Sequence, residues 1–150
     1  MRKTLKQMTA LVRKYKRDTG MITTSRDILN AAGVGERDTR NQIKALQNFV
    51  RDRIKYIPDP RDVEMVQTPP RTLDIRTGDC DDKAVLLATL SETIGFASRF
   101  RAIGVNGGPY SHVLAEVRIG QRWLPLETII AGVEPGWFPP DTTRFMVAHV

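Results

Sequence analysis

Cysteine, histidine and long apolar runs are scarce in this sequence. Its 150 residues include one cysteine and two histidines, so the chain cannot form an internal disulfide and has too few of these ligands for a structural zinc site. No stretch approaches the roughly 20 apolar residues of a membrane-spanning helix, and no apolar segment follows the basic N-terminus as in a signal peptide. The glycines form no phosphate-binding loop. We therefore expect a cytoplasmic protein that needs no metal and no cofactor.

The composition is otherwise ordinary for one globular domain, apart from one concentration of charge. Hydrophobic residues make up 41% of the chain and charged residues 27%, and the formal net charge is +6. Residues 1–18 hold seven basic side chains and one acidic one, so this segment accounts for the whole excess. The basic residues are Arg2, Lys3, Lys6, Arg13, Lys14, Lys16 and Arg17. Apolar residues recur between them at helical spacing, which predicts a helix with one basic face.

Two interpretations of this basic face stay open. The helix can dock on the rest of the protein through its apolar side and leave its cations in water. Alternatively, the cations contact a partner, which would be a polyanion such as nucleic acid, an anionic surface or an acidic protein. A faint similarity to a helix-turn-helix over residues 28–34 ends at Asp38 and Thr39, where the next apolar anchor of that motif should stand.

The one cysteine stands at the start of the most apolar stretch of the chain. Residues 84–94 are apolar around most of a helical circumference, which predicts a buried helix. Asp79 is a natural N-cap, Asp82 stands three residues on in capping-box register, and Gly95 follows the last turn. Cys80 is therefore expected in the first helical turn, near the free N–H groups and the positive end of the helix dipole.

This position favours a reactive thiol. A helix N-terminus can lower a thiol pKa from about 8.5 to roughly 3.5–7.5, although the charges of Asp79, Asp81 and Asp82 act in the opposite direction. A thiolate at Cys80 therefore needs a cationic partner. The alternative is that Cys80 is a small buried core residue. A helix start beside three aspartates is, however, an unfavourable position for a core residue.

A partner is found downstream, in a predicted β-hairpin. Residues 110–119 alternate between apolar and polar as a half-buried strand does, and residues 122–128 form the returning strand. The Gly-Gln pair at 120–121 fits a two-residue hairpin loop with glycine first. The loop length predicts that Ile119 faces Arg122.

This register brings a histidine and an acid together. It places His112 and Glu127 on one face as diagonal neighbours, about 7–8 Å apart at the backbone. Glu116 shares the face but stands about 13 Å from His112 along the strand, so it is excluded as the partner. The hairpin thus supplies a histidine and a carboxylate that can orient it.

At these residues the chain resembles the transglutaminase-like superfamily of papain-related cysteine enzymes. The resemblance rests on residues 78–82, 112–117 and 120–127, with the upstream residues 49–56 and 67–69. It implies an α+β fold in which the cysteine lies on a central helix packed on an antiparallel sheet that carries the histidine and the acid, preceded here by N-terminal helices. The family usually has aspartate followed by proline at the third position, whereas this chain has Glu127 followed by Thr128. The layout also resembles proteins encoded by bacteriophages or prophages, which would place the chain in a host cytoplasm or a virion.

A thiol, a histidine and a carboxylate in this arrangement support acyl transfer at amide bonds. Cys80 would attack the carbonyl of a protein or peptide substrate, His112 would carry the proton and Glu127 would orient His112. The Cys80 backbone N–H is the first oxyanion donor. Tyr56 is a weak candidate for the second, and packing in the core is the favoured alternative for it. We expect a peptidase or amidase; the alternatives are a protein-crosslinking transglutaminase and a non-catalytic module for phage assembly or nucleic-acid docking.

We expect one compact unit with a basic helical extension over residues 1–38 and a transglutaminase-like catalytic domain over residues 39–150. Further predictions concern single segments. They are a short helix over 26–32 capped by Ser25, a long helix from Thr39 to near Tyr56, a loop of little regular structure over 57–77, a strand over 98–105 and an irregular tail over 134–140.

Overall fold

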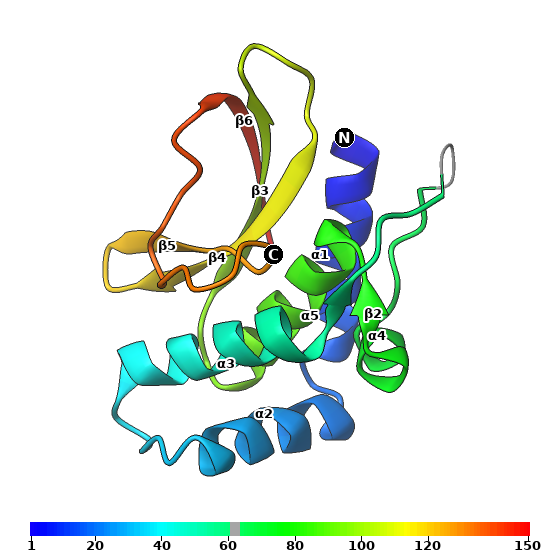
Figure 1. Cartoon of the computed structure of the whole chain (residues 1–150). Coiled ribbons are helices and arrows are strands. Elements are labelled where there is room, and N and C mark those ends of the chain that lie inside the picture. Colours follow the sequence, from blue (N-terminus) through cyan, green and yellow to red (C-terminus); the bar gives the residue numbers. More distant parts are fainter. Residues whose placement is uncertain (61–63) are drawn as a thin grey trace.

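A computed structural model of the chain describes residues 1–60 and 64–150, and these form helices on one side and a sheet on the other (Figure 1). The helices are α1 (Arg2–Tyr15), α2 (Thr19–Ala31), α3 (Thr39–Arg53), α4 (Pro69–Ile75) and α5 (Cys80–Thr93). The strands are β1 (Lys55–Tyr56), β2 (Thr77–Gly78), β3 (Ser98–Val105), β4 (His112–Ile119), β5 (Arg122–Leu126) and β6 (Thr142–His149). The predicted α+β class is confirmed. No helix within the described ranges is long and apolar enough to cross a membrane.

The main sheet has four antiparallel strands in the order β5-β4-β3-β6. Its two central strands, β3 and β4, carry the apolar residues that face the helices, and β6 closes the free side of β3. A second, two-stranded parallel sheet joins β1 to β2 just before the cysteine helix. This small sheet connects the end of α3 to the start of α5.

Helix α5 lies at the centre of the fold, as predicted. Every residue from Asp82 to Ser91 is buried, because α1, α2, α3 and α4 pack around it and β4 and β3 lie against it. The predicted capping box is present, with the Asp79 side chain accepting from the Asp82 N–H and the Asp82 side chain accepting from the Asp79 N–H. The caps define where α5 begins and so fix the position of Cys80 in its first turn.

Helix α1 is packed into the same core as the sheet. Leu5, Met8 and Val12 are buried beside Phe100 of β3 and Val85 of α5. The basic residues occupy the other side of the helix, where most are exposed. The predicted division between an apolar and a basic face of this helix is therefore confirmed.

Three predictions of local structure are corrected. Helix α2 begins at Thr19, well before the predicted start, because the Asp18 side chain caps it by accepting from the Met21 N–H. Ser25 is not a cap; it lies inside the helix and its hydroxyl donates to backbone carbonyls of Met21 and Leu90. Helix α3 ends at Arg53, earlier than predicted.

Residues 57–77 were expected to be irregular, but they contain α4 and β2. The Thr68 side chain accepts from the Arg71 N–H, and Pro69 and Pro70 occupy the first turn of α4. Proline is well tolerated there because the first N–H groups of a helix have no intrahelical acceptor. Strand β6 was not predicted either. Residues 61–63 of the expected loop lie outside the described part of the chain.

Candidate active site

The β4–β5 hairpin has the predicted register. Ile119 faces Arg122 and the ladder continues to Ala115 opposite Leu126, so Glu127 is the first residue beyond it. The side chains of His112 and Glu127 meet directly, with His112 Nε2 at 2.7 Å from Glu127 Oε2. The structure therefore brings together the two residues that the register predicted as neighbours.

Glu127 is held as a buried carboxylate. It is 1% exposed, and its Oε1 accepts from the N–H groups of Thr128 and Ile129 at 2.8 and 2.9 Å. Burial alone would raise the pKa of Glu127, but the hydrogen bond and charge of His112 and the two backbone N–H groups outweigh it and lower this pKa. Gln47 of α3 donates to the Glu127 carbonyl at 3.0 Å and fixes the backbone. With Nε2 of His112 engaged, Nδ1 is the ring nitrogen left to take a proton.

Glu116 has a different role, as the register predicted. Its buried carboxylate pairs with Arg99 and Arg101 of the neighbouring strand β3. The Arg99 guanidinium also lies over the Trp123 ring at 4.4 Å. Two arginines therefore neutralise Glu116, and it does not contact His112.

Cys80 is the first residue of α5, and its sulfur lies against the start of β4. The backbone N–H of Val113, the residue after His112, lies close enough to the sulfur to lower the pKa of the thiol. The thiol itself donates to Asp81 Oδ1 at 3.6 Å. Within residues 1–60 and 64–150, no hydrogen bond joins Cys80 to His112; the two residues are neighbours through the backbone of β4.

The pKa of the Cys80 thiol is raised, which is opposite to the effect expected from the helix position alone. Burial is the main cause, followed by the negative charge of Asp81 and then Asp79, and the Val113 N–H opposes them only in part. The sequence had indicated that the aspartates act in this direction. The resting group is therefore a neutral thiol that needs a base to remove its proton.

The first turn of α5 offers free backbone donors. Asp82 N–H is taken by the cap and Lys83 N–H by the Asp79 carbonyl, whereas the N–H groups of Cys80 and Asp81 have no acceptor in the described part of the chain. Such donors can stabilise an oxyanion beside the sulfur. Gly78 allows this close packing, since a Cβ there would lie 2.7 Å from the Asp82 Cβ.

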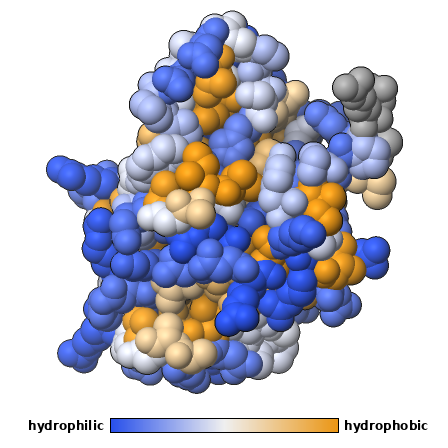
Figure 2. All heavy atoms as spheres, in the orientation of Figure 1, coloured by the Kyte–Doolittle hydropathy of each residue, from blue (hydrophilic) through white to orange (hydrophobic). Residues whose placement is uncertain are grey.

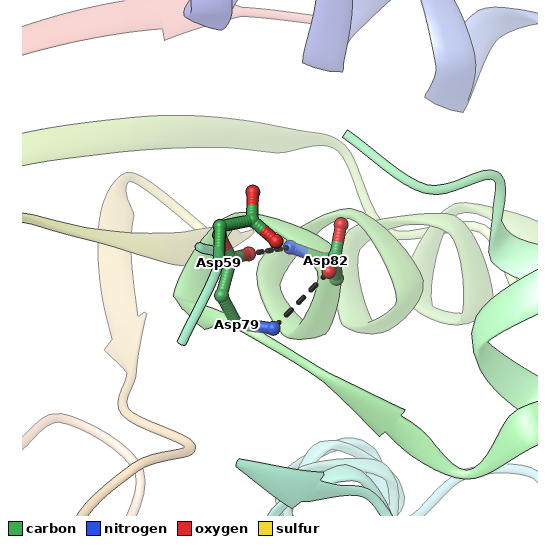
Figure 3. Close-up of side chains that lie close together, drawn as sticks. All are labelled: Asp59, Asp79 and Asp82. Atoms are coloured by element: carbon green, nitrogen blue, oxygen red, sulfur yellow. Dashed lines mark hydrogen bonds between the residues drawn. The ribbon is translucent and has the colours of Figure 1, made fainter. Parts of the chain in front are cut away.

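Three carboxylates gather on the same side of the helix start. The carboxylate oxygens of Asp59, Asp79 and Asp82 lie within 4.8 Å of one another (Figure 3), and these residues could hold a metal ion. Asp82 is already satisfied by Gln67, whose N–H and side-chain amide donate at 2.7 and 2.8 Å. Burial and the neighbouring carboxylates raise the pKa of Asp79 to about 7. The sequence did not reveal this group, because Asp59 is far from the helix in sequence.

Tyr56 lies near the thiol. It pairs with Gly78 across the small parallel sheet and is 45% exposed. Partial burial raises the pKa of its phenol, and the negative charges of Asp79 and Asp81 add to the effect. A side chain this exposed is not packed in the core, and no hydrogen bond of its hydroxyl within the described residues indicates an oxyanion role.

A separate groove of about 790 Å³ lies between α2 and α3. Its floor includes Ile28, Ala45 and Phe49, and Figure 2 shows apolar atoms gathered over this part of the surface. Arg76 lies over the Phe49 ring at 5.3 Å and forms one wall. None of the three predicted site residues lines this groove.

A comparison with protein families identifies the family to which a chain with this site belongs. The model of the transglutaminase-like superfamily matches residues 27–128. The chain belongs to this superfamily. The match includes Cys80 and His112 and extends to Thr128, just after Glu127. No curated protein matches the sequence.

Solved structures share the transglutaminase-like fold at low sequence identity. Calcium-bound LapG from Legionella pneumophila is 16% identical with a TM-score of 0.64, and the match covers 93% of this chain and 80% of LapG. A candidate cysteine protease from Cytophaga hutchinsonii is 17% identical with a TM-score of 0.61 over 91% of this chain. A candidate protease from Parabacteroides distasonis is 14% identical with a TM-score of 0.60 over 80%. This chain spans only 52% of the Cytophaga structure and 25% of the Parabacteroides structure.

Proposed function

We propose that the chain is a cysteine-dependent hydrolase of amide bonds, a peptidase or amidase, that uses Cys80, His112 and Glu127. The observation that carries the proposal is the 2.7 Å contact between His112 Nε2 and the buried Glu127 carboxylate, one residue from Val113, whose backbone N–H lies near the Cys80 sulfur. Membership of the superfamily supports the same class of chemistry. Glutamate takes the orienting role that aspartate usually has.

In the first half of the reaction the Cys80 thiol gives its proton to His112 Nδ1 as the sulfur attacks the substrate carbonyl carbon. The carbonyl oxygen becomes an oxyanion, which the N–H groups of Cys80 and Asp81 can stabilise. His112 then gives the proton to the leaving nitrogen, the C–N bond breaks, and an acyl thioester remains on Cys80. Glu127 stabilises the protonated imidazole throughout.

In the second half water attacks the thioester. His112 takes a proton from the water, the C–S bond breaks, and the proton returns to the sulfur as the acid product leaves. If a lysine amine attacks in place of water, the product is a new amide and the enzyme is a transglutaminase. The first half of the reaction is the same for both.

One experiment tests the enzyme and separates these outcomes. The protein is mixed with casein and a fluorescent primary amine, the reaction is quenched in acid, and intact-mass spectra are taken. Hydrolysis predicts acylated Cys80 and new peptide termini without incorporated amine, whereas amine in the product indicates transfer. If the wild-type and Cys80→Ala proteins give the same products, the catalytic proposal is wrong and a non-catalytic module is favoured.

The histidine is tested without a substrate. His112→Ala should slow alkylation of Cys80 by iodoacetamide at pH 7 by about 10²-fold, because the neutral thiol loses its base. Ser111→Ala, one residue earlier and exposed, is the matched control. Equal rates in His112→Ala and the control would remove His112 from the mechanism.

We further infer that the basic face of α1 contacts a polyanion or an acidic protein surface. Lys16 is paired with Glu92 and Arg13 donates to the His149 carbonyl, while Lys3 and Lys6 are exposed. Binding to heparin or DNA should weaken with salt, and a Lys3→Glu/Lys6→Glu variant should bind less with a smaller salt dependence. Equal binding by the variant and the wild type would contradict this contact.

A further inference from the structure

A buried cation lies one helical turn beyond Cys80. Lys83 is 2% exposed and occupies the first turns of α5. Both features are unfavourable for an ammonium group, because burial removes its hydration and the N-terminal end of a helix carries a positive partial charge. An apolar side chain of similar length would avoid both costs. Favourable contacts with the surroundings must therefore offset the free-energy cost of burying this cation.

Two hydrogen bonds of the Lys83 ammonium provide this compensation. Its Nζ donates to the Ile54 carbonyl at 2.7 Å and to the Arg51 carbonyl at 3.3 Å. Both carbonyls belong to the C-terminal end of α3, where the last carbonyls have no intrahelical donor and the helix dipole is negative. The ammonium thus caps α3 from within the core, and α5 and α3 are tied together by this side chain.

This cap is connected to the cysteine through the small parallel sheet. Ile54 leads directly into β1, where the Lys55 N–H donates to the Arg76 carbonyl at 2.8 Å and the Ile57 N–H to the Gly78 carbonyl at 3.0 Å. Gly78 stands two residues before Cys80, and Tyr56 lies between the two bonded N–H groups. The Lys83 side chain therefore holds the end of α3 from which β1 extends toward the cysteine.

We propose that Lys83 is a positioning residue, which caps α3 and thereby holds β1, Tyr56 and the residues before Cys80 in their places at the active site. The proposal rests on the hydrolase function proposed above, since it assigns to Lys83 the geometry in which Cys80 reacts. Lys83 does not contact the substrate in this scheme. It acts through α3 and β1.

The pKa of Lys83 is lowered so far that a small rise above neutral pH would remove its charge. Burial lowers its pKa most, the charges of Asp52 and Glu127 raise it, and Arg51 lowers it further, with the result that the pKa falls to about 8. Asp52 and Arg51 lie on α3, and Glu127 follows β5. Above this pH the neutral amine keeps N–H groups but no longer has the charge that the end of α3 attracts. The anchor should therefore weaken as the pH rises past 8.

Two variants separate charge from size. Lys83→Met keeps most of the volume and removes the donor, whereas Lys83→Arg keeps a charge that does not titrate in this range. Ser91→Ala is the control, because Ser91 is buried on the same helix and its hydroxyl donates to the Leu87 carbonyl of that helix. The first measurement is amide hydrogen exchange at Lys55 and Ile57, which reports β1 without any enzymatic activity.

Lys83→Met should speed exchange at these two amides by at least about tenfold, while Ser91→Ala should leave it close to the wild-type rate. The second measurement is the rate of Cys80 alkylation from pH 6 to 10. The wild type should show a second ionisation near pH 8 beside that of the thiol, and both Lys83 variants should lack it. Lys83→Met should also react about tenfold more slowly at pH 7.

A folded Lys83→Met protein with wild-type exchange and a wild-type pH profile would overturn the proposal. If this variant does not fold, Lys83→Arg decides: an ionisation near pH 8 that persists in it cannot come from Lys83, and its loss supports the proposal. A failure of the hydrolase function would look different. His112→Ala would then leave alkylation unchanged, while the exchange of Lys55 and Ile57 would still respond to Lys83→Met.

Discussion

Asp81 and Cys80 are adjacent in the chain, and their side chains are joined by a hydrogen bond. The thiol donates to Asp81 Oδ1 at 3.6 Å, an interaction that favours the neutral thiol and competes with transfer of its proton to His112. Burial and nearby carboxylates also raise the pKa of Asp81, to about 6. At neutral pH the resting site therefore combines a carboxylate, a protonated sulfur and a base that is not yet bonded to it.

Replacing Asp81 should make the thiol more reactive. Asp81→Asn removes the largest charge effect that raises the pKa of Cys80, so this pKa should fall and alkylation at pH 7 should be faster by about 3- to 10-fold. The rate of iodoacetamide labelling against pH measures both quantities. Asp27→Asn, an exposed aspartate on α2, is the control, and no difference between the two variants would contradict the assigned effect of Asp81.

Substitutions of Glu127 give a second prediction for a single residue. Glu127→Gln places an amide against the imidazole and favours the wrong tautomer, so kcat should fall by about 10²- to 10⁴-fold. Glu127→Asp is too short to hold His112 and both N–H groups at once, so it should lose some activity. Because it keeps the charge, it should lose less activity than Glu127→Gln. Steady-state kinetics of both variants test this order. A glutamine variant as active as the aspartate variant would show that the charge is unimportant.

The pKa of Glu127 also predicts how stability and activity change with pH. Because this pKa is lowered in the folded protein, the carboxylate contributes stability that is present above its ordinary value of 4.5 and is lost as the pH falls through the folded value. Activity that depends on the ionised acid should therefore persist down to about pH 4.5 unless the fold is lost first.

Among the elements, those with strong local signals could be predicted from the sequence. The capping box of Asp79 and Asp82 located α5, and the Gly-Gln turn fixed the hairpin register and so the neighbourhood of His112 and Glu127. The contact of Cys80 with the Val113 backbone was not predictable, because it depends on how α5 packs against β4.

Other elements lacked such signals. Strand β6 depends on pairing with β3, far away in sequence, and β2 has only two residues. In α4 the prolines suggested a loop, although Thr68 before them is an N-cap and the first turn accepts proline. The burial of Lys83 was not predicted either, because it depends on the packing of α3 on α5. Long-range contacts decide these cases.

Helix α1 gives a prediction at the scale of an element. Its apolar side is part of the core, so Met8→Ala should lower the free energy of unfolding by about 2–5 kcal/mol. Gln7→Ala, on the exposed side of the same helix, should change it by less than about 0.5 kcal/mol. Urea denaturation measures both. Equal small effects would mean that α1 is not needed for the core.

Across the whole molecule the charges are segregated. Basic residues cover the outer side of α1, while Asp59, Asp79, Asp81 and Asp82 gather where α5 begins. Burial, and then the repulsion between these carboxylates, raises the pKa of Asp79 to about 7 and that of Asp81 to about 6. A chain with a net charge of +6 thus places its candidate nucleophile in a locally acidic setting.

This arrangement predicts how stability changes with pH. A carboxyl group whose folded pKa is raised contributes stability that is present below its ordinary value, here 3.8, and is lost as the pH rises through the folded value. The wild type should therefore lose stability relative to Asp79→Asn between pH 4 and 7. Asparagine still caps the helix, so the variant should fold. Parallel urea-denaturation profiles of the two proteins across this range would contradict the raised pKa.

The length of the turn at residues 120–121 has a consequence for comparing relatives. Gly120 adopts a positive φ of 61° in this tight connection, and the loop sets which residue of β5 follows the ladder beside His112. Gain or loss of one residue would send Glu127 to the opposite face, and a change of two would slide it about 7 Å along the strand. A homologue that keeps the cysteine, the histidine and the acid but differs in turn length would thus carry the motif without the acid–base pair, so insertions here matter more to functional assignment than most substitutions do.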